Sequence, residues 1–129
     1  MNKGQKAGII TFLHNHNYGS ALQAYALQRV IRELGIACEH LDYQPDRTEK
    51  IRNLLESGNS PKLVLEGMRK REVRMEQGGA RRKDELIQTF YRKHMQLSAP
   101  CRNGSELREE GAKHDILLCG SDQIWNPRA

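Results

Sequence analysis

Apolar residues in the first forty-five positions form three runs with different periods. Residues 7–13, "AGIITFL", are short, apolar and β-branched, which is typical of a strand buried on both faces. From Ser20 onward apolar residues recur every three or four positions, which predicts a helix with one apolar stripe: Ala24, Leu27, Ile31 and Leu34. Residues 36–43, "IACEHLDY", predict a second strand that Pro45 closes. Strand, helix and strand in this order form a βαβ unit with parallel strands.

The ends of the predicted helix carry recognisable signals. "SALQ" predicts a capping box, in which the Ser20 hydroxyl binds the Gln23 amide and the Gln23 side chain reaches back to the amide of Ser20. Gly35 follows the last apolar position and predicts the C-terminal stop.

Residues 46–96 are charged and favour helices, with breaks at "SGNSP" and "GG". Three helices are predicted, at 48–56, 61–77 and 80–94, each with a thin apolar stripe. A short helix capped by Ser105 and a third strand, "HDILLCG", follow. If the third strand pairs with the free side of the first, the chain is a three-layer α/β domain over 1–129, with a short parallel sheet of order 2-1-3 and a helical insertion at 46–96.

Charge and cysteine content limit the function classes. Lys and Arg exceed Asp and Glu by 21 to 16, a net charge of +5, which favours either anionic partners or simply a solvated surface. Acids are interspersed through the basic middle, so nucleic-acid binding is not predicted. Three widely spaced cysteines without a C-x-x-C pair predict free thiols in a reduced, cytoplasmic protein, with Cys38 and Cys119 buried in strands. Neither a signal peptide nor a membrane-spanning run is recognisable.

Two polar loops follow the first and third strands, and in order 2-1-3 they become neighbours. The first, "HNHNYG", leads into the helix, so amides near residues 20–22 are predicted either to face an anion or to form a tight turn that uses the backbone freedom of Gly19. His14 and His16 lack a third ligand, so no metal is predicted. Asp42 is expected to cap the turn into Pro45.

The second loop, "GSDQIWNP", concentrates polar groups beside the only tryptophan. Asp122 offers an acid or base, Gln123 and Asn126 offer paired donors and acceptors, and Trp125 offers a flat face for a sugar ring. The alternative is structural: local backbone bonds from Asp122 and Asn126, with Trp125 filling the core.

Taken together, "GIITFLHNHNYGSALQAYALQ", "LDYQP", "FYRKHMQLS" and "DILLCGSDQIWNP" resemble the polysaccharide pyruvyl transferase family, in the same order and over nearly all of the chain. The resemblance implies one Rossmann-like half of a glycosyltransferase-B-type fold, with the chain as the N-terminal part of a longer enzyme. It implies transfer of a pyruvyl group from phosphoenolpyruvate to a sugar of a surface polysaccharide, without a cofactor.

The resemblance also implies site residues and partners. Asp122 is the catalytic candidate, and the ligand-binding candidates are His14, Asn15, Asn17, Tyr18, Gly19, Ser20, Gly120, Ser121, Gln123, Trp125 and Asn126. The partners are phosphoenolpyruvate and a saccharide acceptor, and a lipid-linked acceptor would bring peripheral membrane association. A sheet cut short would expose an edge, so self-association is expected. The alternative function is a truncated, non-catalytic remnant or ligand-binding module of the same fold.

Overall fold

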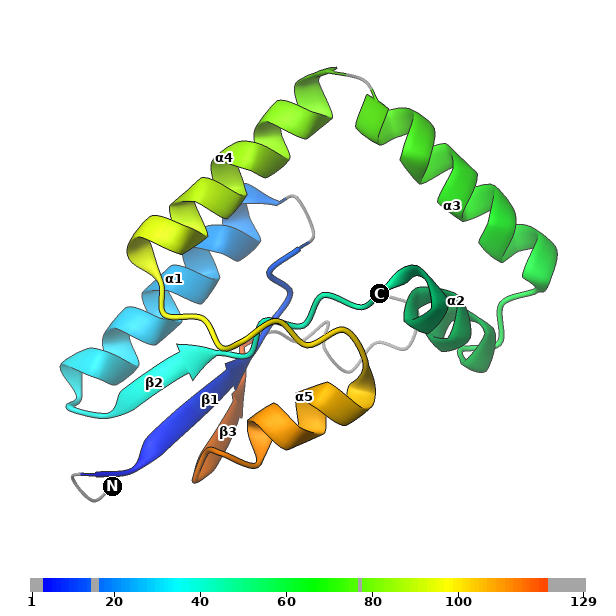
Figure 1. Cartoon of the computed structure of the whole chain (residues 1–129). Coiled ribbons are helices and arrows are strands. Elements are labelled where there is room, and N and C mark those ends of the chain that lie inside the picture. The colour runs from blue at the N-terminus through cyan, green and yellow to red at the C-terminus, as the bar shows by residue number, and fades with distance from the viewer. Residues whose placement is uncertain (1–3, 15–16, 77, 121–129) are drawn as a thin grey trace.

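The computed structural model describes residues 4–14, 17–76 and 78–120. Within them the chain is α/β, with three parallel strands in the order β2-β1-β3 and five helices (Figure 1). The strands are β1 (Lys6–Ile10), β2 (Ala37–His40) and β3 (Ile116–Cys119), and the helices are α1 (Tyr18–Glu33), α2 (Arg47–Glu56), α3 (Pro61–Glu76), α4 (Gly78–His94) and α5 (Gly104–Gly111). The predicted class and strand order are confirmed.

Helices cover both faces of the sheet. Helices α1 and α4 lie side by side on one face, and α5 lies on the other, while α2 and α3 extend away from the sheet as an arm that returns to α4 (Figure 1). On the α1 side Ala7 and Ile9 of β1 are buried against Ile31 and Cys38. Gly8 faces the α5 side, where an added Cβ would lie 2.9 Å from the Leu117 side chain and 3.1 Å from the His114 ring.

A second apolar cluster joins α1 to α4. Its buried members are Leu13, Ala21, Ala24, Ile87, Tyr91 and Met95. The insertion is therefore anchored to the sheet layer by α4, whereas α3 packs against α2 and α4 with Val64 as its buried residue.

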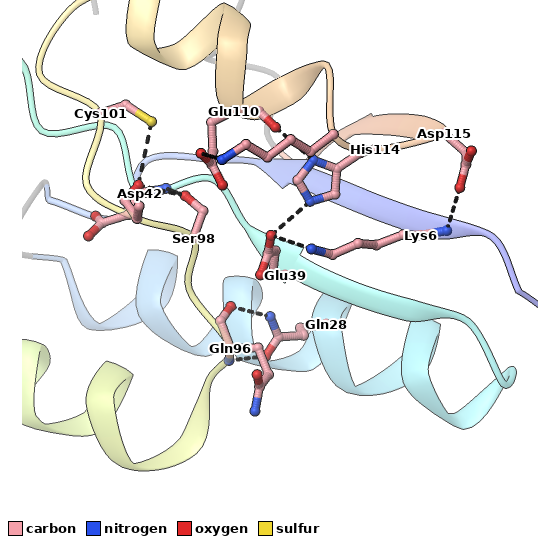
Figure 2. Close-up of polar contacts among 12 residues, drawn as sticks. Lys6, Gln28, Glu39, Asp42, Gln96, Ser98, Cys101, Glu110, His114 and Asp115 are labelled. Carbon is pink, nitrogen blue, oxygen red and sulfur yellow. Dashed lines mark hydrogen bonds and ion pairs between the residues drawn. The ribbon is translucent and has the colours of Figure 1, made fainter.

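Residues 96–101 extend the sheet beyond β2. The amide of His40 donates to the Gln96 carbonyl and the amide of Ser98 donates to the His40 carbonyl, which makes a parallel bridge at the outer edge of β2. The side chain of Gln28, which is 2% exposed, clamps this segment by donating to the Gln96 carbonyl and accepting from the Gln96 amide, each over 2.8 Å (Figure 2). Neither the bridge nor the clamp is visible as a periodic pattern in the sequence.

The amino end of the sheet is held by charged groups. His114 Nε2 lies 2.9 Å from a Glu39 carboxylate oxygen, and Lys6 Nζ donates to the same oxygen over 2.8 Å (Figure 2). Burial alone would raise the pKa of Glu39, but these two hydrogen bonds outweigh it and hold the pKa below its ordinary value. This cluster ties all three strands together.

Helix caps differ from the prediction at two places. Helix α1 begins at Tyr18 and is capped by Asn17, whose side-chain oxygen accepts from the amides of Gly19 and Ser20, so the predicted capping box at Ser20 is wrong. Helix α5 is capped by Asn103 rather than Ser105. In both cases asparagine reaches the first-turn amides from a position one or more residues upstream. Gly35, with a φ of +82°, ends α1 as predicted.

Strand lengths and one cysteine also differ. The first strand ends at Ile10 rather than at residue 13, because Leu13 turns into the α1–α4 cluster, and the second strand spans 37–40 rather than 36–43. Cys38 is buried as predicted, but Cys119 is exposed because alternate residues of β3 face a side that no described helix covers at that point. No helix in the described ranges is both long and apolar enough to cross a bilayer.

Candidate functional site

The carboxyl ends of β1 and β3 lie side by side. The two strands pair in parallel with Ile10 opposite Cys119, and the Gly120 amide donates to the Ile10 carbonyl over 2.9 Å. The Gln23 side chain of α1 also donates to the Gly120 carbonyl. The end of β1, shortly before the first polar loop, is therefore joined to Gly120 at the start of the second loop, and the strand order is the predicted one.

Gly120 sits where a side chain would not fit easily. An added Cβ would lie 3.0 Å from a Leu27 methyl group and 3.3 Å from the Thr11 Cβ. A glycine here lets the start of the second loop pass close to the end of β1 and to α1.

The amide groups of residues 19–21, at the start of α1, have hydrogen-bond partners within the chain. The Asn17 side chain accepts from Gly19 and Ser20, and its carbonyl accepts from Ala21. Of the two predicted alternatives, an open anion site and a tight strand-to-helix turn, these bonds favour the tight turn. Gly19 lies in the first turn of α1, and its φ is not positive. Glycine leaves room for the capping side chain here, because an added Cβ would lie 3.2 Å from Asn17 Oδ1.

His14 is the polar centre of this edge. Its Nε2 lies 2.7 Å from an Asp42 carboxylate oxygen, and its Nδ1 lies 3.0 Å from the side-chain nitrogen of Gln88 on α4. The other Asp42 oxygen accepts from the Gln44 side chain over 2.8 Å. Asp42 therefore orients two side chains, which replaces its predicted role as a cap of the turn into Pro45.

His40 is the last residue of β2 and lies two positions before Asp42. His40 is fully buried, and its Nε2 donates to the Ala24 carbonyl of α1 over 2.9 Å. Burial lowers the pKa of His40 to about 4, although the bond to Ala24 opposes this. Tyr91 of α4 is also fully buried, and burial, with a smaller contribution from Asp84, raises its pKa to about 12. Both groups are neutral at pH 7.

Tyr18 lies further out. Its side chain is half exposed, and Lys83 Nζ of α4 lies 4.7 Å from the centre of its ring. A cation over an exposed tyrosine ring contributes about 0.5–1 kcal/mol. This contact joins the first loop to α4 a second time and brings a positive charge to the entrance of the loop.

Of the predicted set the structure describes six residues: His14, Asn17, Tyr18, Gly19, Ser20 and Gly120. Asn17 to Ser20 form the start of α1, His14 contacts Asp42 and Gln88, and Gly120 contacts Ile10 and Gln23. The candidates Asn15, Ser121, Asp122, Gln123, Trp125 and Asn126 lie outside the described residues, as does His16. The described ranges contain no group of three or more His, Cys, Asp or Glu side chains arranged to hold a metal ion.

Sequence reasoning missed Gln28 and Gln88, gave Gln23 a capping role in place of its bond to Gly120, and misjudged Asp42. Gln88 lies between the buried Ile87 and Tyr91, and Gln28 interrupts the stripe of α1 in the same way. A glutamine on the apolar face of a helix is the signal that would have found both, because a buried amide needs polar partners.

Two surface hollows lie apart from this edge. One is lined by Arg81, Arg82, Glu85, Leu86 and Thr89 of α4, and the other by residues of α1 together with His94. Neither hollow is lined by His14, Asp42 or Gln88. Searches of the chain against protein-family models, curated proteins and solved structures find no match.

Proposed function

We propose that the chain forms one wall of the active site of a polysaccharide pyruvyl transferase-like enzyme. In this proposal a pyruvyl group passes from phosphoenolpyruvate to a sugar of a surface polysaccharide, and the domain is the first Rossmann-like half of a glycosyltransferase-B-type fold. The observation that carries it is the hydrogen bond between the Gly120 amide and the Ile10 carbonyl. This bond supports the proposal because it joins Gly120, the first residue of "GSDQIWNP", to the end of β1, from which the chain leads into "NYGSALQAYALQ". These two stretches are the most specific parts of the family resemblance.

The position of this edge supports the proposal. Ligands of open parallel sheets bind outside the carboxyl ends of the strands, where successive connections run to opposite faces. Here the connection after β1 runs through α1 on one face, and the connection that enters β3 runs through α5 on the other (Figure 1). The edge between β1 and β3 is therefore such a switch point, and both motifs begin there.

The residues at this edge suit a hydroxyl-rich ligand. His14 with Asp42 is a pair that can take a proton, and Tyr18 and Lys83 offer a ring and a cation. Asp122, as acid or base, and Gln123, Trp125 and Asn126, as sugar contacts, remain part of the proposal. The partners proposed are phosphoenolpyruvate and a saccharide, and a lipid-linked acceptor would bring the protein to a membrane surface.

The test is release of phosphate from phosphoenolpyruvate by the full gene product that carries residues 1–129, with oligosaccharide acceptors. Acceptor-dependent release is expected. Asp122→Asn should lower kcat by about 10²- to 10⁴-fold, the usual contribution of one proton-transferring group. Glu109→Gln, an exposed change on α5, is the matched control and should leave the rate unchanged. Absence of phosphate release with every acceptor class would count against the proposal.

One observation favours a second candidate, a non-catalytic ligand-binding module of the same fold. Both ring nitrogens of His14 already have protein partners, as expected of a histidine with a structural role. Saturable binding of phosphoenolpyruvate without turnover would select this candidate.

A further inference from the structure

His14 is held between Asp42, which has several other hydrogen bonds, and the side chain of Gln88, which a ligand can displace. Asp42 is 5% exposed, and its carboxylate accepts from both His14 and Gln44 while its amide donates to the Ser98 hydroxyl over 2.9 Å (Figure 2 shows the Asp42 and Ser98 pair). Ser98 in turn donates to the Ala99 carbonyl. Asp42 is thus fixed by the segment that extends β2, whereas Gln88 reaches His14 through a flexible side chain on α4.

The hydrogen-bonding roles follow from the chemistry of the partners. An ionised carboxylate only accepts, so the proton of the His14 ring must lie on Nε2, which faces Asp42. A neutral ring then has an acceptor at Nδ1, and the group facing it is the amide nitrogen of Gln88, which only donates. The three side chains therefore form a consistent chain: Gln88 donates to His14, and His14 donates to Asp42.

We propose that Nδ1 of His14 is the binding position for a ligand hydroxyl, and that the Gln88 amide occupies this position when no ligand is bound. A sugar hydroxyl donates to the same lone pair of Nδ1. One hydrogen bond from the ligand therefore replaces the hydrogen bond from the Gln88 side chain. The hydroxyl proton then moves to Nδ1, its electron pair stays on the sugar oxygen, and the imidazolium that results is stabilised by Asp42. One part of this inference rests on the proposed function: the statement that the hydroxyl belongs to the acceptor sugar.

Exposure distinguishes this site from the other histidine–carboxylate pair of the fold. His114 also faces a carboxylate, but its side chain is fully buried and lies at the amino end of the sheet. The His14 side chain is 25% exposed and lies at the carboxyl edge, where a ligand can approach it. The histidine–carboxylate pair at the amino end of the sheet is therefore buried and has a structural role, whereas the pair of His14 and Asp42 at the carboxyl end is accessible to a ligand.

The first test is the tautomer of His14 in the unliganded protein, read from the nitrogen shifts of the ring by NMR at pH 8. The proton is expected on Nε2, with Nδ1 as the unprotonated nitrogen. A proton on Nδ1 would overturn the proposal, because that nitrogen could not accept a hydroxyl proton. This measurement needs no variant, so it is independent of how substitutions affect folding.

The second test is carbethoxylation of His14 by diethylpyrocarbonate, which attacks an unprotonated ring nitrogen, followed by peptide mass mapping. Gln88→Ala should increase the rate at His14 about fivefold, the factor that corresponds to removing one hydrogen bond worth about 1 kcal/mol. Glu85→Ala, on the exposed side of the same helix, is the control and should not change it. An unchanged rate in a folded Gln88→Ala protein would overturn the proposal.

The third test adds methyl β-galactopyranoside, as a simple hydroxyl donor, to the wild-type protein. A selective change in the Nδ1 shift of His14 is expected, and no change at saturating sugar would overturn the proposal. These outcomes are separate from the proposed function. If phosphate is released but the His14 proton lies on Nδ1, the proposed hydroxyl site is refuted and the proposed transferase function stands. If the tautomer and the sugar response are as expected but no phosphate is released, the transferase function is refuted and the hydroxyl site stands.

Discussion

The amide of Gly120 donates to the carbonyl of Ile10 over 2.9 Å, at the point where β1 and β3 end. One hundred and ten positions separate these residues in the chain, and the whole helical insertion lies between them. Because the two strands are parallel, both polar loops leave the sheet at this edge. The candidate site at this edge of the sheet depends on this relationship.

The closeness of Gly120 to its neighbours leads to the first prediction. Gly120→Ala places a methyl group 3.0 Å from Leu27 and 3.3 Å from Thr11, so one of them or the loop must move. Overpacking of this kind costs about 1–3 kcal/mol. The free energy of unfolding, measured with urea, should fall by that amount.

Gly67→Ala is the matched control for this change. Gly67 lies inside α3 with nothing near its Cβ position, so alanine should raise the free energy of unfolding by up to about 1 kcal/mol through helix propensity. Equal effects of the two substitutions would contradict the close approach at Gly120.

The buried His40 predicts a loss of stability in mild acid. Its pKa is about 4 in the folded protein against an ordinary value of 6.5, so between these values the unfolded chain binds a proton that the folded chain does not. The contribution is complete above pH 6.5 and is lost as the pH falls toward 4. The loss should reach about 2 kcal/mol at pH 5 and about 3 kcal/mol at pH 4.

His40→Gln tests this assignment, because glutamine keeps a donor for the Ala24 carbonyl but does not titrate. Urea unfolding at pH 7.5 and pH 5 should show a smaller difference in the variant than in the wild type. Glu39, whose pKa is lowered, adds its own loss only below its ordinary value of 4.5, which lies outside this window. Equal differences in both proteins would assign the acid sensitivity to other groups.

The outer edge of β3 predicts self-association. Within the described residues β3 is the last strand on its side of the sheet, Leu117 is half exposed and the Cys119 thiol is exposed. Unpaired strand edges with apolar side chains favour pairing with another chain. Light scattering should show a mass that rises with concentration in the presence of a reductant and in Cys119→Ser, which excludes a disulfide as the cause. A compact monomer at high concentration would contradict this prediction.

Much of the fold follows from local pattern. The helix-favouring composition and the breaks at "SGNSP" and "GG" placed the helices of the insertion within two residues. The parallel order 2-1-3 was expected from the βαβ unit and the long connection to the third strand. These features were predictable because they depend on spacing along the chain and on the limited ways of connecting parallel strands.

The features that were missed depend on contacts between distant residues. Asn17 replaces Ser20 as the cap because its longer side chain reaches two amides at once, a choice that the sequence leaves open. Residues 96–101 join the sheet through backbone bonds to β2, and Gln28 holds Gln96 from sixty-eight positions away. The pairing of His14 with Asp42 and Gln88 likewise needs three elements in place. Such contacts leave a trace only as polar residues on otherwise apolar faces.

The central claim is that the two polar loops form a single ligand site. Its most direct test is a titration of the isotope-labelled protein with phosphoenolpyruvate, with the amide resonances of His14, Tyr18 and Gly120 followed by NMR. All three should shift together with one dissociation constant, while the amide of Gly67 on the distant α3 stays unchanged. Shifts confined to one loop, or separate dissociation constants for the two, would contradict a shared site.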